Sequence, residues 1–322
     1  MPKQHNRLLL TGKLMFLFKS MSAKDRMHIL ITGGTGFIGL ALCEYFAKMG
    51  YSISILTRNI TKKGLPVNVT LLDDLSLNEQ PFDVIINLAG EPLSKKRWNS
   101  AFKQKIYDSR INMTNLVIDY IKQCPIKPKV LLSASAIGFY GDSLDEIFNE
   151  ESQQTHQTFP QKLCHDWEER ALQAQKYGVR VCILRLGVVL EKHGGALAEM
   201  VIPFKLGLGA TLGHSKQWMS WVHLNDVVGM IDFLMHHSDL NGPFNLTAPS
   251  PVANKEFTKT LAKQLMRPSF LNIPGCVAKI AFAEMADALL LSGQNVVPYR
   301  IKNAGYIFKH PTLKDALATI FK

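Results

Sequence analysis

Short runs of apolar residues alternate along the chain with longer segments in which apolar residues recur at helical spacing. The apolar runs that we predict to be strands are residues 28–32, 52–56, 67–72, 84–88, 129–133 and 180–184. Helical spacing is clearest in residues 37–49 and 100–123. Short strands alternating with helices are typical of a parallel sheet with right-handed crossovers and helices on both faces. The pattern therefore predicts an α/β fold with a doubly wound parallel sheet.

The pattern loosens after Arg185. Five glycines lie between positions 194 and 213, which predicts loops over a site. A strand over 218–223, a helix over 226–236, a short segment at 244–246 and a helix over 254–266 follow. We expect residues 27–185 and 222–238 to form the main domain, and residues 186–221 and 239–322 a smaller α/β substrate lobe.

Composition and charge fit a folded soluble protein. The 322 residues are 47% hydrophobic and 20% charged, which is ordinary for a globular protein with a large core. Residues 1–26 hold six Lys and Arg residues against one Asp, so they carry +5 of the net charge of +11. The remaining positive charge forms no basic stripe interleaved with aromatic residues, so we expect no nucleic-acid partner.

The first 26 residues have no place in the strand and helix pattern. Their apolar run, residues 8–18, is broken by Lys13, is too short to span a bilayer and lacks a small-residue cleavage site. We expect a disordered tail, or a working start at Met27; a transit peptide or a membrane-surface helix is the alternative. We expect no membrane association of the folded chain.

The cysteine pattern bears on compartment and metals. Five cysteines, an odd number, occur without any C-x-x-C spacing, and no H-E-x-x-H sequence is present. This pattern indicates a reducing, cytoplasmic location and predicts no disulfide framework and no metal site.

A glycine-rich turn joins the first predicted strand to the first predicted helix. The sequence TGGTGFIG has the spacing G-x-x-G-x-x-G. Gly33 permits a tight turn, Gly36 lets a pyrophosphate approach the backbone, and Gly39 lets the helix pack close to the sheet. The helix N-terminus then offers free N–H groups to the phosphates. The predicted cofactor residues here are Gly33, Gly34, Thr35, Gly36, Phe37, Ile38 and Gly39, and the predicted cofactor is NAD(P).

The end of the second strand decides between the two nucleotides. Folds selective for NAD place an acid there for the ribose 2′-hydroxyl, but this chain has Thr57 and Arg58, with Lys62 and Lys63 shortly after. A guanidinium can bind a 2′-phosphate bidentately, so we predict NADP(H) in preference to NAD(H); a solvated basic loop is the alternative. The further predicted cofactor residues at this edge of the sheet are Asp74 and Leu75 near the adenine, Leu88, Ala89 and Gly90 near the ribose, and Ser133 and Arg185.

Several motifs together resemble a known family. TGGTGFIG, NLAG after the fourth strand, SASAIGFYGD after the fifth, LRLG after the sixth and WVHLND resemble the extended short-chain dehydrogenases/reductases, which include sugar-nucleotide epimerases. AGEPLSKKRW, Ser109-Arg110, DWEERAL and the tail from Pro298 to Tyr306 are more narrowly similar to bacterial "epimerase family" proteins with a C-terminal domain of unknown function. The resemblance covers nearly all of residues 27–322.

The resemblance implies catalytic residues, but one pair is missing. The family uses a Ser, a Tyr with a Lys four residues later, and an Asn on the long helix, with the Tyr as general acid/base. Ser135 and Asn112 match the Ser and the Asn. Pro160 and Cys164 stand where Tyr and Lys would be. Acid/base chemistry in this chain would therefore need a substitute.

Substitute and substrate-binding residues can be named. Tyr140, Cys164 and Glu91 are candidate catalytic groups, although a thiol in a helix is more often a core residue. Lys95 and Arg97 follow the fourth strand, at the edge where ligands bind in such folds, and they suit an anionic substrate such as a nucleotide sugar. Trp221 and His223 complete the predicted substrate residues; the plain alternatives are core packing for the aromatic residues and a solvated face for the charges.

Two functions stay open at this point. The first is an NADP(H)-dependent epimerase or reductase acting on a small anionic substrate. The second is a non-catalytic NADPH-binding sensor or scaffold that lacks the Tyr and Lys. The family resemblance also implies a homodimer through the helices at 100–123 and 166–175.

Overall fold

A seven-stranded parallel sheet forms the centre of the computed structural model, which describes residues 27–322 except 78–79, 154–157, 283 and 287–290. The strand order is β12-β7-β5-β4-β1-β2-β3. The strands are β1 (His28–Thr32), β2 (Ser52–Leu56), β3 (Val69–Leu72), β4 (Val84–Asn87), β5 (Val130–Ala136), β7 (Arg180–Leu186) and β12 (Gly242–Leu246). Because every neighbouring pair is parallel, the carboxyl ends of the strands meet at one edge. The predicted fold class is confirmed.

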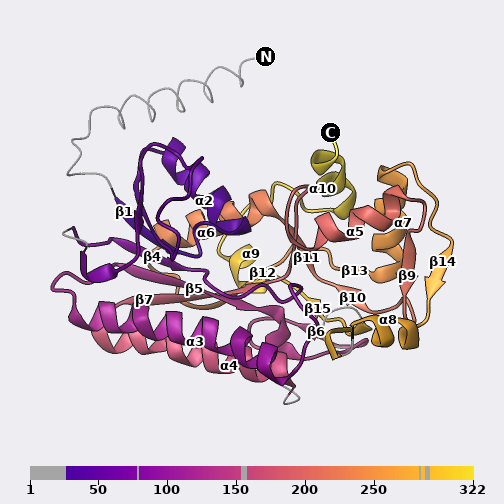
Figure 1. Cartoon of the computed structure of the whole chain (residues 1–322), viewed down its shortest axis with the longest axis horizontal. Helices are drawn as coiled ribbons and strands as arrows, with labels where there is room; N and C mark the ends of the chain where they lie inside the picture. The colour runs from indigo at the N-terminus through magenta and orange to yellow at the C-terminus, as the bar shows by residue number, and fades with distance from the viewer. Residues whose placement is uncertain (1–26, 78–79, 154–157, 283, 287–290) are drawn as a thin grey trace.

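Helices cover both faces of the sheet. α2 (Phe37–Lys48) and α6 (Leu224–His236) pack on one face, and α3 (Ser100–Gln123) and α4 (Phe159–Leu172) lie side by side on the other (Figure 1). Each face has its own apolar core, because strands buried on both sides carry apolar residues in both directions. This arrangement fixes the turns that follow β1, β2, β4 and β5.

A third core lies beside the carboxyl edge of the sheet. It contains the fully buried Trp221 and apolar residues of α5 (Gly195–Lys205), α7 (Asn254–Gln264) and α10 (Leu313–Ile320). Short strands accompany these helices: β6 (Ile147–Phe148), β8 (Val188–Leu190), β9 (Ala210–Leu212), β10 (Trp218–Met219), β11 (Trp221–His223), β13 (Val252–Ala253), β14 (Leu271–Ile273) and β15 (Asn295–Val296). The remaining helices are α8 (Gly275–Phe282), α9 (Tyr299–Asn303) and the 3₁₀ turns η2 (Leu75–Leu77), η3 (Ile137–Tyr140) and η4 (Gln173–Tyr177).

The structure corrects three of the predicted elements. β12 pairs with β7 in the central sheet, so the prediction that residues 239–322 belong wholly to the smaller lobe is wrong for this strand. Residues 195–205 form α5 although we predicted loops there, because the two glycines stand only at its start, Gly194 as the N-cap and Gly195 as the first residue, and most of the rest of the helix is apolar. The single strand predicted over 218–223 is divided into β10 and β11, which pair with different strands.

Two expectations concern membranes and the first residues. Within the described part of the chain, no helix is long and apolar enough to cross a membrane. Residues 1–26, predicted to be a disordered tail, lie outside the described residues.

Candidate cofactor and substrate site

The glycine turn between β1 and α2 is shaped by close contacts that exclude side chains. Gly33 has a φ of +70°, and a Cβ there would lie 2.9 Å from the backbone of Leu88 and Ala89. A Cβ at Gly39 would lie 2.3 Å from the carbonyl oxygen of Gly33. The helix therefore packs directly on the turn, as the glycine spacing predicts.

The first turn of α2 has the properties of an anion site. Gly36 caps the helix without any side-chain hydrogen bond, and no acidic residue stands in the first turn. Gly36 is exposed, and the nearest atom to a Cβ there would be the Gly33 carbonyl oxygen at 3.2 Å. The first N–H groups of a helix lack intrahelical partners and carry the positive end of its dipole. The turn thus fits a pyrophosphate.

The end of β2 is basic and contains no carboxylate. Thr57 is half-buried, and its N–H donates to the Leu72 carbonyl. Arg58 is exposed directly after it. The Lys62 ammonium donates to the carbonyl oxygen of Thr35 in the glycine turn at 2.7 Å, so a second cation lies against the turn. The sequence places Lys62 near the turn without a role, and this contact makes it a candidate residue of the site.

Asn87 at the end of β4 links the strands beneath the turn. Its side-chain oxygen accepts from the Thr32 hydroxyl at 2.7 Å, and its amide donates to Thr114 and Ser133 at 2.9 and 3.1 Å. Ser133 is fully buried in this network, and its role as a cofactor residue stays a prediction. The network holds Leu88 and Ala89, whose N–H groups bond to Thr32, against the glycine turn.

Asp74 and Leu75 follow β3. The Asp74 carboxylate accepts the Ser76 N–H at 2.8 Å, and this bond lowers the pKa of Asp74. Leu75 is buried in the core between the sheet and α3. Asp74, which is exposed, and Leu75 stay predicted adenine neighbours.

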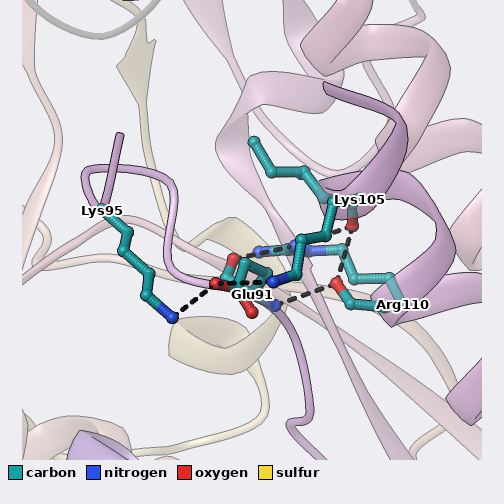
Figure 2. A network of polar contacts seen from close by, with 6 residues as sticks. Glu91, Lys95, Lys105 and Arg110 are labelled. Atoms are coloured by element: carbon teal, nitrogen blue, oxygen red, sulfur yellow. Dashed lines mark hydrogen bonds and ion pairs between the residues drawn. The ribbon is translucent and has the colours of Figure 1, made fainter. Parts of the chain in front are cut away.

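Glu91 lies at the centre of a small charged network on the loop after β4. Its carboxylate accepts from Lys95 at 2.8 Å and has Lys105 of α3 at 3.8 Å, and Figure 2 shows the two lysines approaching it from different elements. The hydrogen bond from Lys95 and the Lys105 charge hold the pKa of Glu91 below its usual range. Glu91 is therefore ionised at neutral pH and can accept a proton but has none to donate. Lys105 was not predicted.

Arg110 of α3 approaches the same loop from the helix side. Its guanidinium donates to the main-chain oxygens of Glu91 and Ile106 at 3.2 and 3.0 Å and lies over the Trp167 ring at 5.2 Å. A Cβ at Gly90 would lie 2.8 Å from the guanidinium carbon. Burial lowers the pKa of Arg110.

Ser135 at the end of β5 belongs to a buried polar chain. Its hydroxyl donates to Glu168 of α4 at 2.6 Å, and Glu168 accepts two bonds from Arg185 at 2.9 and 2.8 Å. Burial alone lowers the pKa of Arg185, but the bonds and charge of Glu168 outweigh it and raise that pKa. Arg185 is thus engaged in an internal ion pair, and its role as a cofactor residue stays a prediction. Glu168 was not predicted.

Tyr140 continues the same chain away from the site. It is fully buried, accepts from Arg185 at 2.8 Å and donates to Asn245 at 2.7 Å. Burial raises its pKa to about 12. A phenol enclosed in this way cannot exchange a proton with a substrate, so the structure argues against a catalytic Tyr140.

Cys164 occupies the position of the expected Lys. It is buried, and burial, followed by the charge of Glu168, raises its pKa to about 11. A Cβ at Gly138 would touch Pro160 at 3.3 Å and Cys164 at 3.9 Å, so both residues face η3. Cys164 is a thiol rather than a thiolate at neutral pH, which removes its main route to reactivity.

Four predicted residues lie elsewhere. Asn112 is exposed, because Arg110 and Thr114, one helical turn apart, take the face of α3 toward the sheet. Trp221 is fully buried in the third core and donates to the Ser250 carbonyl. His223 is the N-cap of α6 and accepts the Asn225 N–H. Arg97 is exposed and donates to the carbonyl of Ile280.

The described residues contain one group of potential metal ligands. On the surface of α4, one potential ligand atom from each of His165, Asp166 and Glu169 lies within 4.8 Å of the other two. Such surface groups are common without an ion, and the sequence prediction of no metal site stays a prediction.

A parallel sheet, a glycine turn at an uncapped helix and a basic segment after β2 define a dinucleotide-binding protein of the extended short-chain dehydrogenase/reductase type. The chain belongs to the NAD dependent epimerase/dehydratase family, whose profile matches residues 29–247, and residues 273–320 match the domain of unknown function DUF1731. Epimerase family protein YfhF of Bacillus subtilis is 37% identical over 300 residues, which are 91% of this chain and 98% of the relative.

Two solved structures show the same fold. Human epimerase family protein SDR39U1 (isoform 2), solved with NADPH, has a TM-score of 0.84 and 32% identity, and the match covers 92% of this chain and 99% of the human one. UDP-glucose 4-epimerase of Thermus thermophilus, in complex with NAD, has a TM-score of 0.74 over 92% of this chain and 99% of that one. Its identity of 17% shows a shared fold alone.

Proposed function

We propose that the chain binds NADPH at the β1–α2 turn and acts as an epimerase- or reductase-like protein on a small anionic substrate. The observation that carries the cofactor is the uncapped N-terminus of α2 at the exposed Gly36, with Arg58 and no acid at the end of β2. The NADPH-bound human relative supports the same nucleotide, whereas the Thermus protein of this fold was solved with NAD. The preference for NADPH thus depends on Arg58.

Each part of the cofactor would have its own residues. Gly33 to Gly39 would hold the pyrophosphate, Thr57 and Arg58 the 2′-phosphate, and Leu88 to Gly90 the ribose. A bound nicotinamide supplies or accepts a hydride. Glu91, ionised beside Gly90, can take up a proton, and Lys95 and Lys105 supply positive charge for an anionic substrate. A nucleotide sugar is one substrate of this class.

A second function is favoured by a specific observation. The Ser135 hydroxyl gives its proton to Glu168, Cys164 is a buried thiol, and Pro160 has no proton to exchange. The groups at the usual catalytic positions therefore cannot donate a proton to a substrate. This supports a protein that binds NADPH and senses or presents it without turnover.

Calorimetric titration of the whole chain with NADPH and with NADH tests the cofactor. We expect tight NADPH binding and much weaker NADH binding. Absence of binding to either nucleotide, in folded protein free of carried-over nucleotide, contradicts the proposal. If NADPH binds, oxidation of the bound cofactor by candidate sugar nucleotides distinguishes an enzyme from a sensor.

We also propose a homodimer through α3 and α4. The two helices pack side by side on one face of the sheet, and Leu116 of α3 is 43% exposed. Light scattering tests this, since a monomeric mass at working concentration contradicts it.

A further inference from the structure

Arg110 forms no ion pair with a carboxylate in the described part of the chain, although the Glu91 charge acts on it. Its guanidinium is partly buried, and both of its hydrogen bonds go to main-chain oxygens, of Glu91 and Ile106. Removing a charge from water is unfavourable unless an opposite charge compensates it, and here that compensation is incomplete.

The nearby acid is directed elsewhere. The Glu91 side chain is turned toward Lys95 and Lys105, while only its main-chain oxygen faces Arg110 (Figure 2). The Glu91 carboxylate therefore forms its ion pairs with the two lysines and none with the guanidinium. The local network of Glu91, Lys95, Lys105 and Arg110 carries an excess of positive charge.

The position of Arg110 is also informative. The guanidinium lies so close to Gly90 that a Cβ there would be 2.8 Å from its central carbon and 3.0 Å from Nη2. Gly90 is exposed and ends the segment proposed to border the cofactor. Cys164, at the place of the expected Lys, lies within electrostatic range of Arg110. Arg110 of α3 thus brings a positive charge near Cys164 of α4, which stands where the family resemblance implies a Lys.

We infer that Arg110 is the receptor for an oxyanion of the substrate, a carboxylate or a phosphate, bound beside Gly90. A guanidinium is planar and presents parallel donors to two oxygens of one oxyanion. A bound oxyanion would also supply the missing countercharge. Lys95 and Lys105 lie at the outer side of the same network, where they would draw the anion inward. This inference deepens the proposed function by naming the substrate group that the site recognises.

The test is calorimetric titration of the full chain with oxalate and with inorganic phosphate, each with and without NADPH. We expect saturable binding of at least one probe, and the stronger one identifies the oxyanion as carboxylate or phosphate. Arg110→Met should weaken that binding at least about tenfold, which is about 1.4 kcal/mol. Arg110→Lys should weaken it less, because the charge stays but the planar fork is lost. Arg267→Met, which removes an exposed arginine that follows α7 and has no predicted role in the site, is the control and should bind like the wild type.

Arg110→Met can fail to fold, since its two main-chain bonds are lost. Circular dichroism identifies that case, and a crystal structure of the wild type with the stronger probe then decides, because the oxyanion should lie on Arg110. Failure of the wild type to bind either probe, or equal binding by wild type, Arg110→Met and Arg110→Lys, overturns the inference. The titrations without NADPH keep this outcome separate from a failure of the cofactor proposal.

Discussion

The Ser135 hydroxyl lies 2.6 Å from a carboxylate oxygen of Glu168, and this pair determines what Ser135 can do. Glu168 accepts two hydrogen bonds from the Arg185 guanidinium, and a carboxylate in such an ion pair offers only acceptor atoms. Ser135 must therefore donate its proton to Glu168. It has lone pairs left but no proton for a substrate carbonyl, unlike the Ser that the family resemblance implies.

Glu168→Gln should destabilise the protein, because it leaves the Arg185 guanidinium buried without its countercharge. Breaking one partner of a buried pair costs roughly 3–5 kcal/mol. Urea unfolding of the variant and the wild type measures the difference in the free energy of unfolding. Glu169→Gln, on the exposed face of the same helix, is the control and should change it by less than about 0.5 kcal/mol.

The double variant Glu168→Gln with Arg185→Met separates the pair from its surroundings. With both charges absent, much of the lost stability should return. If the double variant loses as much free energy of unfolding as the two single variants together, the ion pair is not the source of the effect.

Arg58→Ala should weaken NADPH binding about ten- to a hundredfold and leave NADH binding nearly unchanged. The reason is the loss of a charge-assisted bond to the 2′-phosphate, a group that NADH lacks. Calorimetry with both nucleotides measures it, and Lys63→Ala, an exposed cation of the same loop, is the control. Equal loss for the two nucleotides rules out Arg58 as the 2′-phosphate ligand.

Gly36→Val should abolish binding of both nucleotides while leaving the fold intact. The backbone of Gly36 has a φ of −86°, which valine can adopt, and only the Gly33 oxygen at 3.2 Å is close to the new Cβ. The branched side chain would instead occupy the space in front of the helix N-terminus. Thermal unfolding should stay near the wild-type temperature; retained nucleotide binding would mean that the pyrophosphate lies elsewhere.

The sequence predicted the elements with strong local patterns. Buried parallel strands are continuous apolar runs, and the glycine turn needs only residues that are adjacent in sequence, so both were found. β12 was assigned to the wrong part of the molecule because its Gly-Pro start and short length resemble a connection. α5 was missed because glycines stand at its start and Pro203 lies inside it.

The site residues were harder to predict because they meet only in three dimensions. Glu168, Arg185 and Ser135 come from α4, β7 and β5, and no spacing announces their contact. Arg110 could have been found, since it falls with Ile106 and Thr114 on the apolar stripe of α3. Asn112 lies off that stripe and is exposed, so only the motif match, and not the helical pattern, supports it as a site residue.

His223 should make the protein sensitive to mild acid. It is buried at the N-terminus of α6 and stacks on His310 with ring centroids 3.9 Å apart. Burial, and then the charges of His310 and Lys309 against the opposing Asp226, lowers the pKa of His223 to about 4. In the unfolded chain it titrates near about 6.5. Between these values only the unfolded state binds the proton, so the free energy of unfolding falls as the pH is lowered through this range.

His223→Asn should remove that dependence. Asn keeps a side-chain oxygen to cap α6 through the Asn225 N–H, but it does not titrate. Urea unfolding should show the wild type losing up to about 2 kcal/mol more than the variant between about pH 7 and about pH 5. His193→Asn, which removes an exposed histidine, should behave like the wild type. If His223→Asn and the wild type lose equal stability over this range, the acid sensitivity arises from other groups. The explanation by a lowered pKa of the buried His223 is then wrong.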